Sequence, residues 1–190
     1  MINEHLTTDI ANNRDGSSTE QLSMEHLELV PAWGGASHSV SYVYRPTTEH
    51  QLRELLLLAN RSGRSIGLRG GGNSYGDAAL NSENILLDMR RMNRILEWNP
   101  DDGIAKLEPG VTISQLWQYV LEDGWWPPVV TGTSKTTIGG CAAMNVHGKN
   151  AYQAGPIGDH ILEFEIILPS GESILCSREE NSDIFFAAIG

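Results

Sequence analysis

Apolar residues recur along the first part of the chain with the two spacings that distinguish strands from helices. Val40, Tyr42 and Tyr44 alternate with polar residues, which predicts a strand. A helical stripe of leucines follows between Thr48, a candidate N-cap, and Gly63, a candidate C-cap. Further short strands are predicted at residues 65–68, 85–88 and 104–107. The first three strands and the helix predict a β-α-β unit.

The second half of the chain is predicted to mix short helices with a hairpin. Thr112 is a candidate N-cap for an amphipathic helix, and Ser182 or Asp183 is a candidate N-cap for the last helix. Residues 163–168 and 173–176 flank a Pro-Ser-Gly turn, which predicts a hairpin.

Residues 1–37 lack this periodicity and are acidic. Up to about residue 30 they carry one Arg against six carboxylates, so we expect a flexible N-terminal tail with a short helix near its end. The folded domain is expected to span residues 38–190. Because Ile189-Gly190 directly follows an apolar run, we expect a truncated sequence that lacks a C-terminal substrate domain.

Composition excludes several functional classes. The net charge of −11 offers no basic face for a nucleic acid. Cys141 and Cys176 are too few for a disulfide framework or a Cys-rich zinc site, and no metal is expected. No transmembrane segment or signal peptide is predicted, which favours a cytoplasmic protein.

Two stretches of this acidic chain contain no carboxylate. They lie between Glu54 and Asp77 and between Asp123 and Asp159, and both are rich in glycine. Glycine allows close approach of the backbone, so that successive N–H groups can converge on an anion. The two glycine loops therefore predict a site for one polyanion, most simply a pyrophosphate. Ordinary loops with chance gaps in charge remain the alternative.

The common nucleotide-binding motifs do not fit these loops. A G-x-G-x-x-G motif that starts at Gly70 would need glycine in place of Tyr75, and no G-x-x-x-x-G-K-[ST] motif is present. The loops therefore predict phosphate binding of neither the Rossmann nor the P-loop kind.

Four ordered motifs resemble a known family. They are Arg69-Gly-Gly-Gly-Asn-Ser-Tyr-Gly-Asp77, Gly132-Thr-Ser-Lys-Thr-Thr-Ile-Gly-Gly140, Asn145-Val-His-Gly-Lys-Asn150 and Gly155-Pro-Ile-Gly-Asp159. Together they resemble the PCMH-type FAD-binding domain of the vanillyl-alcohol oxidase superfamily, and within it the decaprenylphosphoryl-ribose 2′-oxidase-like sugar oxidases. The resemblance runs from about Ser39 to Gly190. It implies an α+β fold of two subdomains, a small β-α-β unit and a larger mixed-sheet unit, with FAD between them.

The resemblance also implies the residues that bind the cofactor. Backbone N–H groups of both loops would hold the FAD pyrophosphate through charge-assisted hydrogen bonds. The implied residues are Leu68, Arg69, Gly70, Gly71, Gly72, Asn73, Ser74, Tyr75, Gly76, Asp77 and Ala78 in the first loop, and Gly132, Thr137, Ile138, Gly139, Gly140, His147, Gly148, Lys149 and Asn150 in the second.

Asn73 bears on how FAD is attached. Many members of the superfamily have a histidine here that bonds covalently to the flavin, whereas asparagine has no nucleophilic ring nitrogen. We therefore expect noncovalent FAD. A role of the Asn73 amide in stabilising the turn is compatible with this.

The resemblance places His147 and Lys149 beside the isoalloxazine ring and the substrate, and Tyr75 near them, as candidate catalytic residues. A cation there would favour the anionic reduced flavin and help to bind a phosphorylated sugar. The alternatives are a histidine that bonds backbone, a solvated loop lysine and a tyrosine that only packs.

The implied function is an FAD-dependent oxidoreductase module. It would oxidise a C–OH group of a sugar, polyol or sugar phosphate by hydride transfer to flavin N5 and pass the electrons to oxygen or another acceptor. Three alternatives remain: a 2-hydroxy-acid dehydrogenase of the same superfamily, a flavin-binding fragment without turnover, and a sugar-phosphate or nucleotide-binding protein without flavin.

Overall fold

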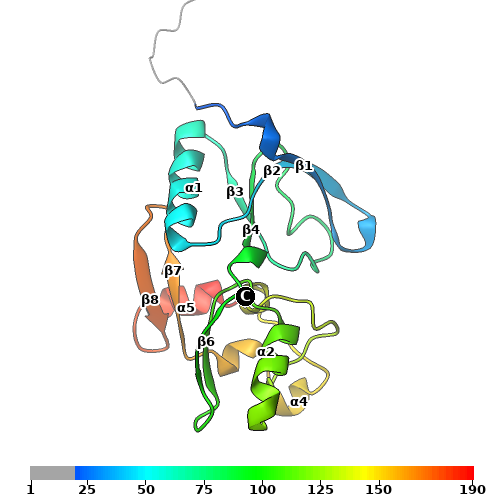
Figure 1. Cartoon of the computed structure of the whole chain (residues 1–190), viewed down its shortest axis with the longest axis vertical. Coiled ribbons are helices and arrows are strands. Elements are labelled where there is room, and N and C mark those ends of the chain that lie inside the picture. The colour runs from blue at the N-terminus through cyan, green and yellow to red at the C-terminus, as the bar shows by residue number, and fades with distance from the viewer. Residues whose placement is uncertain (1–19) are drawn as a thin grey trace, which may run out of the picture.

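The predicted β-α-β unit forms the centre of the first of two subdomains (Figure 1). The structure is a computed structural model, and it describes residues 20–190. The first subdomain consists of β1 (Leu27–Pro31), β2 (His38–Tyr44), α1 (Glu49–Ser62), β3 (Ile66–Arg69) and β4 (Ile85–Asp88). Single 3₁₀ turns lie at Met24–His26, Trp33–Gly35 and Met89–Arg91.

The four strands form one sheet in the order β1-β2-β4-β3. Strands β2, β4 and β3 run parallel, and β1 is antiparallel to β2. Helix α1 covers one face, where Ala59 packs with Ile85 and Leu87. Because parallel strands end at the same edge, the carboxyl ends of β2, β4 and β3 together face the second subdomain (Figure 1).

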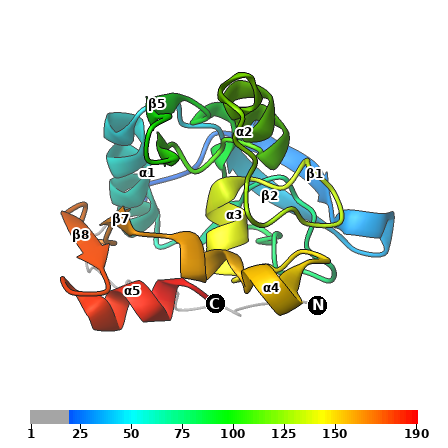
Figure 2. The ribbon, with the colours of Figure 1, turned by 90° about the horizontal axis from the view of Figure 1, so that it is seen from below.

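The second subdomain contains two hairpins and several short helices. Its elements are β5 (Ile95–Asn99), β6 (Ile104–Leu107), α2 (Ile113–Val120), α3 (Ile138–Ala143), α4 (Ala151–Ala154), β7 (Glu163–Ile167), β8 (Ser173–Ser177) and α5 (Ser182–Ala188). Further 3₁₀ turns lie at Leu121–Asp123 and Ile157–His160. Seen from below, α3 lies at the centre, with α2, α4 and α5 around it (Figure 2). Cys141 of α3 packs there with Ile113 of α2 and with Ile157.

One arginine joins the two subdomains. Arg53 on α1 donates from Nε to the carbonyl oxygen of Gly171 at 3.0 Å, and its Nη2 bonds Ser173 Oγ at 2.5 Å. Both acceptors belong to the β7–β8 hairpin, which lies beside α1 in Figure 1. The hairpin is therefore tied to the first subdomain although more than a hundred residues separate the partners.

The capping residues of the two long helices are as predicted. Thr48 accepts a hydrogen bond from Gln51 N–H, and Gly63 ends α1 in the left-handed region with φ of 62°. Thr112 and Gln115 form a complete capping box at the start of α2. The hairpin predicted around Pro169-Ser170-Gly171 is β7–β8.

The expected boundary between a flexible tail and a domain that begins at residue 38 needs correction. Residues Leu27–Pro31 form β1, which pairs along its whole length with residues 38–42 of β2, from Leu27 opposite Tyr42 to Pro31 opposite His38. The acidic residue Glu28 is held there by a bidentate ion pair with Arg45. The folded part therefore begins well before residue 38, while residues 1–19 of the expected tail lie outside the described residues.

Two smaller details also differ from the sequence predictions. In β2 the buried residues are Ser39, Ser41 and Val43, so the strand is correct but Val40 is exposed. The two serine hydroxyls bond each other at 2.9 Å, which removes the cost of burying them. The N-cap of α5 is Asn181 at φ of 48°, rather than Ser182 or Asp183.

Candidate functional site

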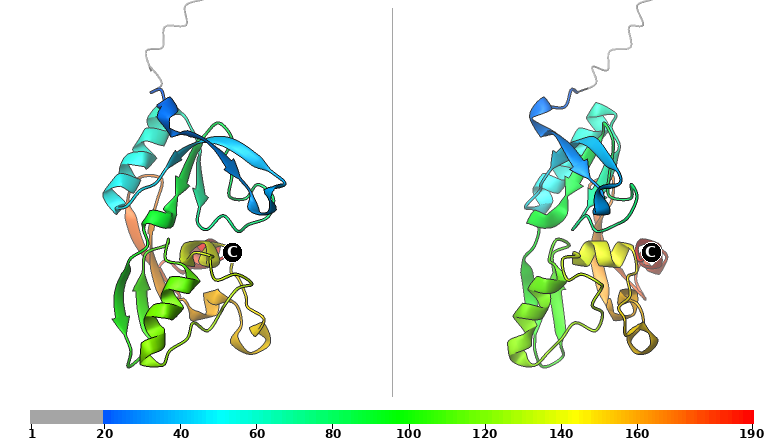
Figure 3. Two further views of the ribbon diagram at one scale, coloured as in Figure 1. Left: turned by 45° about the vertical axis from the view of Figure 1, so that its right-hand side comes forward. Right: turned by 90° about the vertical axis from the view of Figure 1, so that its right-hand side faces the viewer.

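The first glycine loop leaves the carboxyl end of β3 and spans residues 70–79. Figure 3 shows it hanging from the first subdomain above α3. Gly72 and Gly76 both have φ of 67°, a left-handed conformation that favours glycine. Among the described residues, no acceptor takes a hydrogen bond from the N–H groups of residues 71–75. These five amides are therefore available to an anion.

The second glycine loop is held against the first turn of α2 and the segment before it. Ile113 N–H donates to Thr136 O at 3.0 Å, and Ser114 N–H donates to Ser134 O at 2.8 Å. The N–H groups of Ile138 and Gly139 donate to Val111 O and Pro109 O. These two amides, which the resemblance implies as phosphate donors, are thus already used within the protein.

The two loops touch at their glycines. A Cβ atom on Gly70 would collide with Thr137 Oγ1, and one on Gly71 would lie 2.6 Å from the carbonyl oxygen of Lys135. Only glycine permits this approach. The structure therefore brings the two loops together, as the sequence predicted, although about 65 residues separate them.

Two buried oxygen atoms at this junction have no hydrogen-bond partner in the described structure. They are Asn73 Oδ1 in the first loop and Thr137 Oγ1 at the start of α3. A buried polar atom without a partner costs about 1–3 kcal/mol, so native proteins usually satisfy such atoms. The junction is accordingly built to contact a polar group.

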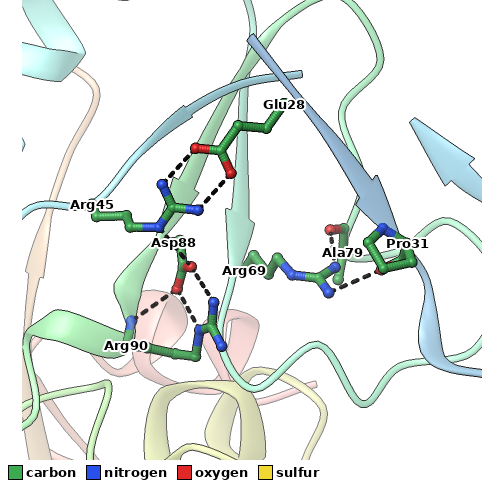
Figure 4. Close-up of polar contacts among 7 residues, drawn as sticks. All are labelled: Glu28, Pro31, Arg45, Arg69, Ala79, Asp88 and Arg90. Carbon is green, nitrogen blue, oxygen red and sulfur yellow. Dashed lines mark hydrogen bonds and ion pairs between the residues drawn. The ribbon is translucent and has the colours of Figure 1, made fainter. Parts of the chain in front are cut away.

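Charge at the neighbouring sheet edge is balanced by a four-residue network (Figure 4). Arg45 binds both oxygens of Glu28, and Arg90 binds both oxygens of Asp88. The Nε atom of Arg45 also lies 3.4 Å from Asp88 Oδ2. Each carboxylate at this edge therefore has an arginine partner, which limits its repulsion of an anion.

Asp88 is ionised in spite of its burial. Its residue is only 3% exposed, and burial alone would raise the pKa of the carboxyl group. The hydrogen bonds from Arg90 and the charges of Arg90 and Arg45 outweigh burial and hold the pKa below its ordinary value.

A pocket of about 390 Å³ adjoins the second loop. It is lined by Trp126, Pro128, Val130, Thr131, Gly132, Lys149 and Asn150. Asn150 donates from Nδ2 to Pro128 O at 3.0 Å, which fixes one wall. The pocket thus combines an indole face, a cation and hydrogen-bonding groups, a set that suits a polar, hydroxylated ligand.

The other two candidate catalytic residues are not among those that line this pocket. His147 is exposed and does not line this pocket, and its Nδ1 lies 3.4 Å from Gly148 O. Tyr75 is 80% exposed on the first loop. Of the three candidate catalytic residues, Lys149 is the one that lines this pocket, and the catalytic roles of all three stay predictions.

Comparison with known proteins identifies the family. A model described as FAD binding domain matches residues 40–177. The chain belongs to this FAD-binding domain family. It is 34% identical over 160 residues to decaprenylphosphoryl-β-D-ribose oxidase of Mycolicibacterium smegmatis, which covers 83% of this chain and 35% of that protein.

More distant relatives agree with this assignment. The putative D-arabinono-1,4-lactone oxidase of Neurospora crassa is 25% identical over 95% of this chain and 32% of its own length. The crystal structure of 6-hydroxy-D-nicotine oxidase from Arthrobacter nicotinovorans superposes with a TM-score of 0.77 at 23% identity, over 86% of this chain and 38% of that one. The chain thus spans about a third of the curated relatives it matches. The expected PCMH-type α+β fold is confirmed.

FAD is the cofactor of the FAD-binding domain family, and the loop junction fits its pyrophosphate. Five amides without protein acceptors can donate to phosphate oxygens. The hydroxyl of Thr137, which has no partner among the described residues, can also donate to a phosphate oxygen. The side-chain amide of Asn73 can turn its NH₂ group toward the junction. Residues 70–76 of the first loop and residues 132–140 of the second contain no carboxylate, so none of these side chains repels the anion.

The remaining implied cofactor residues are spread around this junction. Gly132, Lys149 and Asn150 share the pocket, and Gly148 is buried against Val130. Residues 76–78 are exposed at the far end of the first loop, and the side chain of Leu68 is 66% exposed.

Two features of the site were not predicted from the sequence. Trp126 lines the pocket and packs on Trp117 with ring centroids 5.5 Å apart. The resemblance implies that the backbone of Arg69 binds FAD and says nothing of its side chain, which turns back into the first subdomain. The local sequence does not fix the direction in which a long side chain points. The contacts of Trp126 and Arg69 could therefore not be predicted from the sequence.

No helix in residues 20–190 has the length and apolar character needed to cross a membrane.

Proposed function

We propose that this chain is the FAD-binding part of an oxidoreductase that oxidises a C–OH group of a sugar, a polyol or a sugar phosphate. FAD is held without a covalent bond. The observation that carries the proposal is the contact between the two glycine loops, of which the first presents five amides, those of residues 71–75, without acceptors among the described residues.

The division of work follows from the residues present. When bound, FAD supplies the hydride acceptor at N5. Amides 71–75 and the Thr137 hydroxyl bind the pyrophosphate, and the arginines of the sheet edge keep the nearby carboxylates neutralised. Lys149 places a cation in the pocket beside Gly132, where it would favour negative charge on a reduced flavin or on a phosphorylated substrate.

The substrate class is supported by the pocket and by the relatives. Sugar rings combine apolar C–H faces with hydroxyl groups, which suits an indole beside hydrogen-bonding groups. The relative at 34% identity is named for the oxidation of a ribose derivative. Because this chain spans only about a third of that protein, other parts of a complete enzyme would contribute further contacts.

The test is anaerobic reduction of the FAD-loaded protein by a panel of compounds. Sugars, polyols and sugar phosphates should bleach the visible flavin band, and 2-hydroxy acids should not. Bleaching by 2-hydroxy acids alone would favour the alternative dehydrogenase. Bleaching by dithionite but by no compound of the panel would indicate a flavin-binding fragment without turnover, and a colourless protein after addition of FAD would contradict flavin binding itself.

A Lys149→Ala variant tests the proposed cation. It should retain flavin, because no backbone donor is lost, and should be reduced more slowly by the active compound. Unchanged reduction would leave Lys149 as a solvated loop residue.

A further inference from the structure

Arg69 is the last residue of β3, and its side chain ties together three separate parts of the first subdomain. Nη1 donates to the carbonyl oxygen of Ala79 at 3.0 Å, and Nη2 donates to that of Pro31 at 2.9 Å (Figure 4). Ala79 stands at the end of the first glycine loop, and Pro31 is the last residue of β1. One guanidinium thus connects the start of the loop, its end and a neighbouring strand.

Arg69 differs from the other two arginines of Figure 4 in what it binds. Arg45 and Arg90 pair with carboxylates, whereas the hydrogen bonds of Arg69 within the described residues go to carbonyl oxygens. Burial lowers the pKa of Arg69, which reflects the cost of desolvating its charge. The two carbonyl hydrogen bonds of the guanidinium join the end of the loop to β1.

The loop passes directly over this guanidinium. A Cβ atom on Gly72 would lie 2.7 Å from Arg69 Cζ, and closer still to Nη2. Amides 71–75 make no hydrogen bond to any described residue, so the loop has no internal ladder to define its conformation. Its shape depends on the guanidinium beneath it and on the contacts of Gly70 and Gly71 with the second loop.

We propose that Arg69 is a positioning residue that preorganises the first glycine loop for FAD, without contacting the cofactor itself. Its planar fork reaches two carbonyl groups at once, which the single ammonium of lysine cannot reproduce in the same geometry. Without the two hydrogen bonds of the guanidinium, the loop would adopt several conformations. In few of these would the N–H groups of residues 71–75 converge on one anion. The observed affinity falls in proportion to the binding-competent fraction. The inference rests on the proposed FAD site and adds a residue that shapes it.

The experiment compares Arg69→Lys and Arg69→Gln with a matched control, Arg64→Gln, in the full chain. Arg64 is exposed beside the opposite end of β3 and also donates to a backbone carbonyl, that of Glu83, at 2.7 Å. Stopped-flow measurement with FAD gives the association and dissociation rates. NMR order parameters of the FAD-free protein report the rigidity of amides 71–75.

Both Arg69 variants should bind FAD about tenfold more weakly, and the loss should lie in the association rate. The order parameters of amides 71–75 should fall from the rigid range near roughly 0.85 toward the flexible range below about 0.6. The Arg64→Gln control should change neither quantity. A second variant, Gly72→Ala, keeps the charge but places a methyl group on the guanidinium, and should give the same signature if Arg69→Gln does not fold.

Other results would overturn the proposal. Faster dissociation with unchanged order parameters would mean that Arg69 contacts the cofactor directly, and so would full rescue by lysine. Unchanged rates and order parameters would remove any role for Arg69. If the unmodified chain binds no FAD, the proposed function fails, and the role of Arg69 is then decided by the order parameters alone.

Discussion

Gly71 is one of the two glycines at which the two glycine loops touch. Its missing side chain leaves room for the Lys135 carbonyl and for Asn73 Oδ1, each 2.6 Å from where a Cβ would stand. A larger residue must either push the loops apart or tilt the amides of the first loop. The position therefore controls both the spacing of the loops and the charge that a phosphate meets.

The substitution Gly71→Asp should abolish stable flavin binding. The new carboxylate would occupy the junction and repel the pyrophosphate, and like charges in such a position cost several kcal/mol. The expected loss of affinity is more than about 100-fold. Flavin retained after desalting measures it. The control is Ser82→Asp, which adds the same charge at an exposed residue beyond the loop and should retain flavin.

Asn73 carries the second residue-scale prediction. Since its amide cannot attack the flavin ring, acid precipitation of the loaded protein should release all colour into the supernatant. Colour in the pellet would contradict noncovalent binding and would require a different attachment residue. The sequence predicted the chemistry of this position, because residue type alone decides it. The burial of Asn73 Oδ1 was not predictable, because it depends on contact with a second loop.

At the scale of elements, the beginnings of α1 and α2 were predictable because their caps are local. Thr48 and Thr112 each accept a hydrogen bond from the residue three positions later. Strand β5 was missed because its pairing with β6 includes a register shift that interrupts alternation. Strand β1 was missed because its pairing with β2 and the ion pair of Glu28 outweigh an acidic local sequence.

The two caps allow a matched test of how α2 supports the site. Thr112→Ala and Thr48→Ala should each lower the free energy of unfolding by about 1 kcal/mol. Only Thr112 adjoins the second glycine loop, through its bridge to Thr137. Thr112→Ala should therefore also weaken FAD binding several-fold, while Thr48→Ala should not. Urea denaturation and FAD titration of both variants provide the measurements, and equal FAD affinities would separate α2 from the site.

At the scale of the whole molecule, specific contacts outside the glycine loops also join the two subdomains. Arg53 connects α1 to the β7–β8 hairpin, and Gly110 packs its backbone against Met92 O. The sequence indicated two subdomains with a site between them through the resemblance of its motifs. It could not indicate which residues join them, since these partners are distant in the chain and their types are not distinctive.

Both subdomains also contain a carboxylate that is held ionised by arginine. Asp88 is paired with Arg90 and Arg45 in the first subdomain. Glu108 in the second is 5% exposed and accepts hydrogen bonds from the backbone and guanidinium of Arg94. Burial would raise the pKa of Glu108, but Arg94 outweighs it, so the pKa values of both groups lie below their ordinary range.

These lowered values predict the acid sensitivity of the fold. A carboxyl group whose pKa is lower in the folded state stabilises the fold fully above its unfolded pKa, about 3.9 for Asp and 4.3 for Glu. This stabilisation declines as the pH falls below these values and is lost once the pH passes below the folded pKa. Stability should therefore be level from neutral pH to about pH 5 and should fall steeply below about pH 4.

Asp88→Asn should lower the free energy of unfolding at neutral pH by about 1–2 kcal/mol, because the charge-assisted hydrogen bonds of Arg90 to the buried carboxylate are lost, while Arg45 keeps its pair with Glu28. Its stability should then depend less on pH below pH 5, since the titrating group with the lowered pKa is gone. Urea denaturation from neutral to acid pH measures both effects, with the exposed Glu122→Gln as control. A variant with the same acid dependence as the unmodified chain would show that Asp88 does not account for it. The loss would then belong to the other arginine-paired carboxylates, foremost Glu108.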